Sequence, residues 1–133
     1  MKLIQLSKKG DDRGSLVVVE QGKDIPIEIK RVYYMFDTLK NVRRGFHAHK
    51  KLRQVAIPIA GSCRILLDDG VNVENILLDS PTIGLVIEPM VWHEMYDYSE
   101  DCILMVLADD LYDENDYIRD YAEFMSAINL AKL

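Results

Sequence analysis

Two of the three histidines in the 133-residue sequence stand one residue apart, in the tripeptide His47-Ala48-His49. Side chains alternate between the two faces of a β-strand, so in a strand both imidazoles would point to the same side. Imidazole accepts and donates protons near neutral pH, and such a pair could move a proton on a bound ligand. The alternative is a structural strand in which hydrogen bonds occupy both rings.

Basic residues surround this histidine pair. Five of the sixteen Lys and Arg residues lie in segment 43–53, although the formal net charge of the chain is −6. An acidic protein with one basic segment is unsuited to general nucleic-acid binding, and the segment favours a small anionic ligand. A solvated charged face is the alternative interpretation.

Length and composition predict a single domain over residues 1–133, because nearly half of the residues are hydrophobic and no low-complexity segment is present. Cys63 and Cys102 lie in apolar runs without metal-binding spacing, so we expect buried, reduced thiols. The sequence contains neither a signal-peptide pattern nor an apolar stretch long enough to cross a membrane. We therefore expect a cytoplasmic protein with no membrane partner.

Short segments rich in β-formers follow one another, separated by turn residues such as Asp-Asp-Gly and Asp-Ser-Pro. The spacing leaves no room for crossover helices and predicts an antiparallel sandwich or small barrel. The expected strands, besides the histidine segment, are 2–6, 15–20, 29–37, 54–59, 62–67, 73–78, 83–87, 92–98 and 102–107.

One helix is expected at the C-terminal end, over about 113–130. Asp113 supplies an N-cap, and acidic residues follow in the first turn. Apolar residues then recur at three- and four-residue steps, so we expect their stripe to pack on the barrel. These residues are Tyr117, Ile118, Tyr121, Phe124, Met125 and Ile128.

Two motif blocks have the order H-x-H-x4-Q-x6-G, over residues 47–61, and G-x4-P-x3-H, over residues 84–93. They resemble the signature blocks of the cupin superfamily, whose jelly-roll barrel brings both blocks together. The second block is one residue short, and Gln54 stands where metal cupins have a Glu ligand. A neutral amide adds no charge to hold a divalent cation, which argues against a metal. Three neutral imidazoles can nevertheless bind zinc in a catalytic site, so a metal-dependent cupin such as a dioxygenase remains an alternative.

A closer resemblance covers about residues 10 to 120, in the same order and with similar spacing. The chain resembles the dTDP-4-keto-6-deoxyglucose 3,4-ketoisomerases, which are metal-free relatives of the dTDP-sugar 3,5-epimerases. The matching segments are Asp12-Arg-Gly-Ser-Leu, Ile29-Lys-Arg-Val-Tyr-Tyr34, Arg44-Gly-Phe-His-Ala-His-Lys50, Gly61-Ser-Cys-Arg64, Leu67-Asp-Asp-Gly, Val91-Trp-His-Glu-Met95 and Tyr112-Asp-Glu-Asn-Asp-Tyr-Ile-Arg119.

The resemblance implies an all-β antiparallel jelly-roll (cupin) barrel with one C-terminal α-helix, a homodimer, and a cofactor-independent isomerase that forms an enediol intermediate. It implies that His47 and His49 are the catalytic pair. We favour His49 as the base at C3 and His47 as its partner, although the roles could be reversed. A 3,5-epimerase or a non-catalytic sugar-nucleotide sensor would also be compatible with this fold.

The same resemblance implies residues that bind the dTDP-linked 4-keto-6-deoxyhexose. Arg31, Arg44 and Arg64 are candidates for the diphosphate, because guanidinium groups form paired hydrogen bonds with phosphate oxygens. Arg13 would reach over the barrel mouth towards the sugar, and Gln54 belongs to the binding set.

Strand alternation sorts the remaining aromatic and histidine candidates. Tyr33 and Tyr34 must face opposite sides, so only one of them can line the pocket, and Tyr33 is the candidate. His93 should face the pocket, with Glu94 opposite it, exposed or at an interface. Trp92 is expected in the core rather than stacked on thymine.

The resemblance places the reaction in deoxyaminosugar biosynthesis for a glycan of the lipopolysaccharide or S-layer kind. A second-block His combined with Arg in the Asp-Arg-Gly-Ser turn resembles the branch that forms the 3-keto-6-deoxygalactose product. We therefore expect the galacto configuration at C4.

Overall fold

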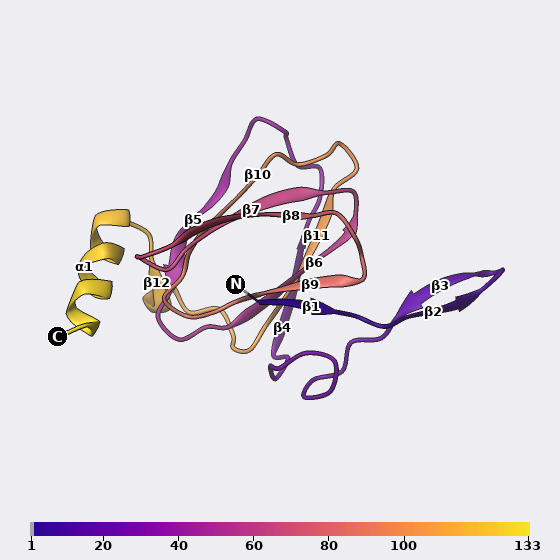
Figure 1. The fold of residues 1–133 in the computed structure, drawn as a ribbon, viewed down its shortest axis with the longest axis horizontal. Helices are drawn as coiled ribbons and strands as arrows, with labels where there is room; N and C mark the ends of the chain where they lie inside the picture. The colour runs from indigo at the N-terminus through magenta and orange to yellow at the C-terminus, as the bar shows by residue number, and fades with distance from the viewer. Residues whose placement is uncertain (1) are drawn as a thin grey trace.

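The computed structural model describes residues 2–133, so Met1 of the expected domain lies outside the described residues. Two five-stranded antiparallel sheets face each other (Figure 1). Their strand orders are β1-β9-β6-β11-β4 and β12-β5-β10-β7-β8, and β2 and β3 form a separate hairpin. No helix within residues 2–133 is long and apolar enough to cross a membrane.

The strands and helices have the following bounds: β1 Lys2–Gln5, β2 Lys8–Asp11, β3 Gly14–Val17, β4 Arg31–Met35, β5 Arg44–His49, β6 Gln54–Ala60, β7 Cys63–Asp68, β8 Val73–Leu78, β9 Ile83–Ile87, β10 Trp92–Tyr96, β11 Ile103–Ala108, η1 Glu114–Asp116, β12 Tyr117–Ile118 and α1 Tyr121–Ala131. The predicted all-β antiparallel jelly-roll with one C-terminal helix is confirmed. The two sheets are not hydrogen-bonded to each other into a closed barrel along the described chain.

Strand alternation divides the buried side chains between the inside of the sandwich and its outer faces. In β6, Ala56 joins the cluster between the sheets, whereas Val55 and Ile57 pack outward. That outward cluster is covered by the segment after β3, through Ile25 and Ile27. The sandwich therefore has apolar material on both faces of the first sheet.

The C-terminal helix begins at Tyr121, not near residue 113 as predicted. Asp113 caps the short 3-10 helix η1, and the chain then forms strand β12 beside β5. The side chain of Asp120 is the N-cap of α1 and accepts a hydrogen bond from the Glu123 amide. Pairing with β5 outweighs the helical periodicity of this segment, because tertiary contacts override weak local propensity.

Helix α1 covers the outer face of the second sheet. Phe124 is fully buried and packs with Ala48, Trp92 and Ile118. The Tyr121 hydroxyl donates a hydrogen bond to Asp68 Oδ2 at 2.6 Å. The helix therefore supports strands β5 and β10 from behind.

The β2–β3 hairpin differs from the single strand expected over residues 15–20. Its two strands pair from Lys8 with Val17 to Asp11 with Gly14. It projects from the sandwich at the end opposite to β12 and α1 (Figure 1).

Candidate active site

Strands β5 and β10 bring the three histidines together. His47 lies directly opposite His93 in the antiparallel register, and their ring centroids are 4.6 Å apart. His47 and His49 have centroids 5.0 Å apart, whereas Ala48 between them is buried under α1. The two imidazoles of β5 therefore share one face, as strand alternation predicts.

A β-bulge lies next to this cluster. His47 pairs with His93 and Gly45 pairs with Glu94, so Phe46 is the extra residue on β5. Gly45 and Phe46 have φ values of 96° and 59°. A Cβ atom on Gly45 would lie 2.8 Å from the carbonyl oxygen of His93, so only glycine fits there. The bulge therefore depends on Gly45 and sets the direction of His47.

Hydrogen bonds define the tautomers of two rings. Nδ1 of His47 lies 3.0 Å from the carbonyl oxygen of Gly45, and Nδ1 of His93 lies 3.1 Å from that of Val91. Because a carbonyl oxygen only accepts hydrogen bonds, each Nδ1 donates a proton to it. The Nε2 atoms of these neutral rings therefore carry lone pairs.

Burial keeps the three imidazoles neutral. Desolvation is the largest of the effects that lower the pKa of His93 to about 3, and the neighbouring His47 and His49 contribute to this shift. Burial, and then the charges of His47, Arg31 and Arg119, lower the pKa of His49 to about 3. The pKa of His47 is also lowered, mainly by burial. Near neutral pH each ring can accept a proton from a ligand.

A cavity of about 560 Å³ opens beside His47, between β4, β5 and β12. Its polar lining includes Arg31, Tyr33, Arg44, His47, Tyr117 and Arg119. Arg31 Nε is buried without a hydrogen-bond partner, and among residues 2–133 neither Arg31 nor Arg44 forms an ion pair. These two guanidinium groups are available to hold an anion.

Tyr33 lines the cavity on the β4 side, and the buried Gln54 of β6 lies behind it. The Tyr33 hydroxyl donates a hydrogen bond of 2.6 Å to Gln54 Oε1, and burial raises the pKa of Tyr33 to about 12. Tyr34 is 63% exposed. Of the two adjacent tyrosines, Tyr33 lines this cavity and Tyr34 does not, as predicted.

A metal ion would have only imidazole ligands here. Each of the three histidines has a ring nitrogen within 4.8 Å of one in the other two. Gln54 is neutral, and its carbonyl oxygen already accepts the Tyr33 hydroxyl. The three ring nitrogens are close enough to contact one divalent ion, but the neutral imidazoles bring no negative charge to balance it.

Arg64 is not in the cavity, contrary to prediction. The core of the sandwich contains its neighbours Cys63 and Ile65, so strand alternation turns Arg64 to the outer face. There its Nε lies 3.4 Å from Asp97 Oδ2.

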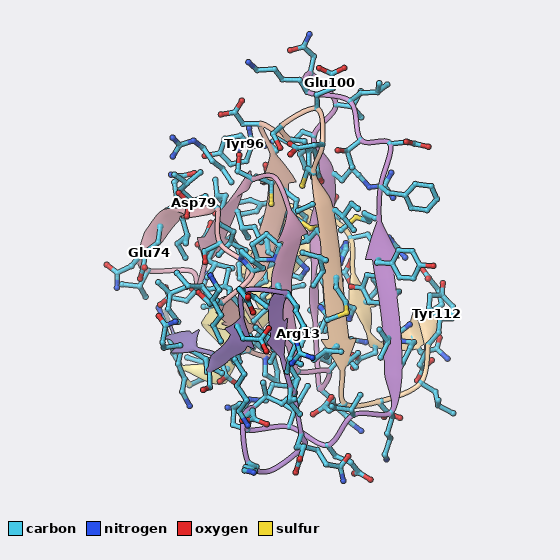
Figure 2. All side chains as sticks on the ribbon, turned by 90° about the vertical axis from the view of Figure 1, so that its right-hand side faces the viewer. Arg13, Glu74, Asp79, Tyr96, Glu100 and Tyr112 are labelled. Atoms are coloured by element: carbon cyan, nitrogen blue, oxygen red, sulfur yellow. The ribbon has the colours of Figure 1, made fainter. Side chains whose placement is uncertain are left out.

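Arg13 is also remote from the histidines within this chain. It occupies the turn of the β2–β3 hairpin and pairs with Asp11, with its side chain 87% exposed. In Figure 2 Arg13 lies at the front of the view, whereas Tyr112, beside Tyr117, lies at the right edge. The hairpin carries Arg13 away from the cavity of its own chain, so Arg13 does not close over that cavity as expected.

Tyr117 and Arg119 are site residues that the sequence patterns did not indicate. Tyr117 pairs with His49 across β12 and β5, and its ring centroid lies 4.4 Å from that of His49. The Arg119 guanidinium lies 4.1 Å from the Tyr117 ring and pairs with Glu114. Tyr117 and Arg119 are two residues apart, a spacing that favours a shared face of an extended segment. The apolar residues at helical spacing in the same segment favoured the helix prediction instead.

Trp92 and Glu94 support the site from behind. Trp92 is buried beside α1, as expected, and its Nε1 donates a hydrogen bond to Glu94 Oε2. Glu94 also accepts from Arg43 Nε, and its side chain is only 17% exposed. Glu94 is thus a structural acceptor and is not exposed, whereas its predicted place at an interface stays a prediction.

Comparison with known proteins agrees with this geometry. Residues 1–129 match the family described as FdtA, WxcM-like, C-terminal. The TDP-4-oxo-6-deoxy-α-D-glucose-3,4-oxoisomerase of Aneurinibacillus thermoaerophilus is 57% identical over 98% of this chain and 96% of its own length. The chain belongs to the FdtA family.

Solved structures show the same architecture. A 3,4-ketoisomerase of Helicobacter canadensis has a TM-score of 0.94 and 50% identity, over 96% of each chain. A histidine variant of the 3,4-ketoisomerase QdtA of Thermoanaerobacterium thermosaccharolyticum, in complex with TDP-4-keto-6-deoxyglucose, has a TM-score of 0.94 and 43% identity, over 97% of this chain and 94% of that one.

Burial of His93 predicts a pH-dependent stability. The folded-state pKa of His93 is about 3, below the ordinary 6.5, so the unfolded chain takes up a proton that the folded chain refuses. This contribution is complete above pH 6.5 and is lost as pH falls towards 3. Between pH 6.5 and about 5 we expect wild type to lose about 1–2 kcal/mol more unfolding free energy than His93→Gln. Urea unfolding at several pH values measures this, and parallel stability curves for the two proteins would contradict it.

Proposed function

We propose that the chain is a 3,4-ketoisomerase that converts dTDP-4-keto-6-deoxyglucose to its 3-keto isomer. The observation that carries this proposal is a pair of neutral imidazoles on one face of β5, beside a basic cavity. Membership of the FdtA family and the activities for which the relatives are named support it.

The chemistry needs a base and an acid but no redox cofactor. A base takes the proton from C3, the electrons of that C–H bond form a C3–C4 double bond, and the C4 carbonyl oxygen gains a proton. The resulting enediol then loses the C3 hydroxyl proton while C4 gains one, which leaves a ketone at C3. His47 and His49 are neutral, adjacent and able to exchange protons in this sequence.

We assign the diphosphate of the substrate to Arg31 and Arg44. Both line the cavity, and the buried Nε of Arg31 lacks a partner. Tyr33, Gln54 and His93 lie on the walls around the reacting carbons in this proposal. We assign His93 to the sugar, because its ring lies beside those of His47 and His49.

We propose a homodimer in which the β2–β3 hairpin contacts a second copy of the chain. Apolar side chains at and near the hairpin are exposed, among them Leu16, Val18 and Ile59, and an uncovered apolar patch favours association. Arg13 is remote from its own cavity. It can therefore contact a sugar only across such an interface.

We place the enzyme in the cytoplasm. Cys63 and Cys102 are free, buried and close enough to interact, an arrangement that a reducing compartment preserves. The 3-keto product is suited to an aminotransferase in deoxyaminosugar biosynthesis. A lipopolysaccharide or S-layer glycan would be the destination.

Replacing the histidines tests the catalytic pair. His49→Asn should keep the fold and nucleotide binding but lower kcat by about 10²- to 10⁴-fold, because a general base is lost. His47→Asn should also lose activity, by a different amount if it serves only one proton transfer. Turnover is followed by NMR of the sugar, with nucleotide affinity from calorimetry as the folding control. Near-wild-type turnover of His49→Asn would refute its role.

Metal removal tests the assignment of proton transfer to imidazoles alone. Because Gln54 contributes no charge, we expect exhaustive EDTA treatment to leave kcat unchanged within about twofold. The matched control is the untreated enzyme passed through the same buffer exchange. Loss of activity that Fe²⁺, Mn²⁺ or Zn²⁺ restores would instead make His47, His49 and His93 metal ligands.

The C4 configuration of the product reports which face of the enediol receives the proton. We expect dTDP-3-keto-6-deoxy-D-galactose, whose C4 hydroxyl is axial and whose H4–H5 coupling is small. The reaction is run in H₂O to read this coupling, and a parallel reaction in D₂O shows whether deuterium enters C4, which marks the ketoisomerase path. Deuterium at C5 would indicate a 3,5-epimerase. Binding of the sugar nucleotide without deuterium exchange would indicate a non-catalytic sensor. An equatorial C4 hydroxyl would refute only the galacto assignment.

A further inference from the structure

The Nδ1 atom of His49 faces a carboxylate. Asp116 Oδ2 lies 3.5 Å from this atom, and the imidazole is only 3% exposed. Within residues 2–133, Nδ1 of His49 has no hydrogen-bond partner, although buried ring nitrogens normally have one. A small movement of the ring brings the pair to hydrogen-bond distance, and such bonds often shorten only when the ligand binds.

The carboxylate of Asp116 is held firmly in place by the segment that follows His49. Oδ1 accepts a hydrogen bond from the Lys51 amide at 2.9 Å, and Oδ2 accepts one from the Leu52 amide at 3.1 Å. The carbonyl oxygen of Asp116 accepts a third from the Lys50 amide. The backbone therefore determines where this carboxylate stands relative to the imidazole.

His47 and His93 have different partners. Each directs Nδ1 at a backbone carbonyl, which fixes the tautomer but carries no charge. Among the histidines of the described chain, only His49 lies within 4.0 Å of a carboxylate. His49 therefore differs from the other two histidines in having a charged group beside Nδ1.

We propose that Asp116 is the positioning residue of His49. It accepts the Nδ1 proton, leaves the Nε2 lone pair for the substrate, and stabilises the imidazolium that forms when His49 takes a proton. The inference rests on the proposed function and deepens it, because it makes His49, not His47, the base at C3.

The charges around His49 explain why a carboxylate is needed. Burial is the largest effect opposing protonation of His49, and the positive charges of Arg31 and Arg119 oppose it too, as a protonated His47 would. When the C3 proton moves to Nε2, its C–H electrons form the enediol double bond and His49 becomes positive inside this basic site. Asp116 is the opposite charge that offsets the cost, at a distance where ion pairing favours the charged imidazole.

The test uses Asp116→Asn, which keeps the size of the side chain but removes its charge. Long-range ¹⁵N–¹H NMR of histidine-labelled protein reports which ring nitrogen of His49 carries the proton. In the wild type we expect Nδ1 to be protonated, and in Asp116→Asn we expect that signal to change. We also expect kcat to fall by about 10²- to 10⁴-fold with little change in KM, as for a general base held in the wrong tautomer.

Asp113→Asn is the matched control. Asp113 caps the neighbouring 3-10 helix, and Asn is an equally good cap, so tautomer and kcat should stay at wild-type values. If Asp116→Asn does not fold, Asp116→Glu replaces it and should keep both the wild-type tautomer and most of the turnover.

Unchanged His49 resonances in Asp116→Asn would overturn the proposal, and so would a kcat within twofold of wild type. A lower Tm without either change would leave Asp116 a purely structural acceptor, which also overturns it. The NMR measurement needs no turnover, so it tests Asp116 even if the protein proves not to be an isomerase.

Discussion

The antiparallel pairing of β5 with β10 is the interaction that organises the site. It places His47 opposite His93, and the bulge at Gly45 and Phe46 turns the histidine face of β5 towards the cavity. The carbonyl oxygen of Gly45, in β5, fixes the tautomer of His47, and that of Val91, just before β10, fixes the tautomer of His93. A shift of register by one residue would move both β5 imidazoles to the α1 side.

Burial then gives these imidazoles their chemistry. A histidine in water is protonated below its ordinary pKa. Desolvation lowers the pKa, so a buried histidine stays neutral until a substrate delivers the proton. The cost of forming an imidazolium there is offset locally by a carboxylate such as Asp116. The site thus combines imidazoles that resist protonation with arginines that attract an anion, and the two sheets each contribute one of these arginines, Arg31 on β4 and Arg44 on β5.

The last part of the chain completes the site in an unexpected way. Helical periodicity predicted a helix from about residue 113, yet residues 117–118 pair with β5 and only then does α1 begin. This short strand carries Tyr117 to His49, and the preceding turn carries Asp116 there. Sequence patterns weigh local propensity, whereas the free energy gained by capping the β5 edge comes from residues distant in the chain.

Local patterns were enough for part of the structure. The short spacing between β-forming segments predicted the antiparallel all-β fold, and strand alternation predicted the shared face of His47 and His49 and the choice of Tyr33 over Tyr34. The chain also carried the family motifs with which the comparisons agree. Folding in three dimensions was needed to turn Arg64 outward, to place Arg13 on a remote hairpin, and to bring Tyr117 and Arg119 into the cavity. Those positions depend on which strands become neighbours, and that depends on contacts between residues far apart in the chain.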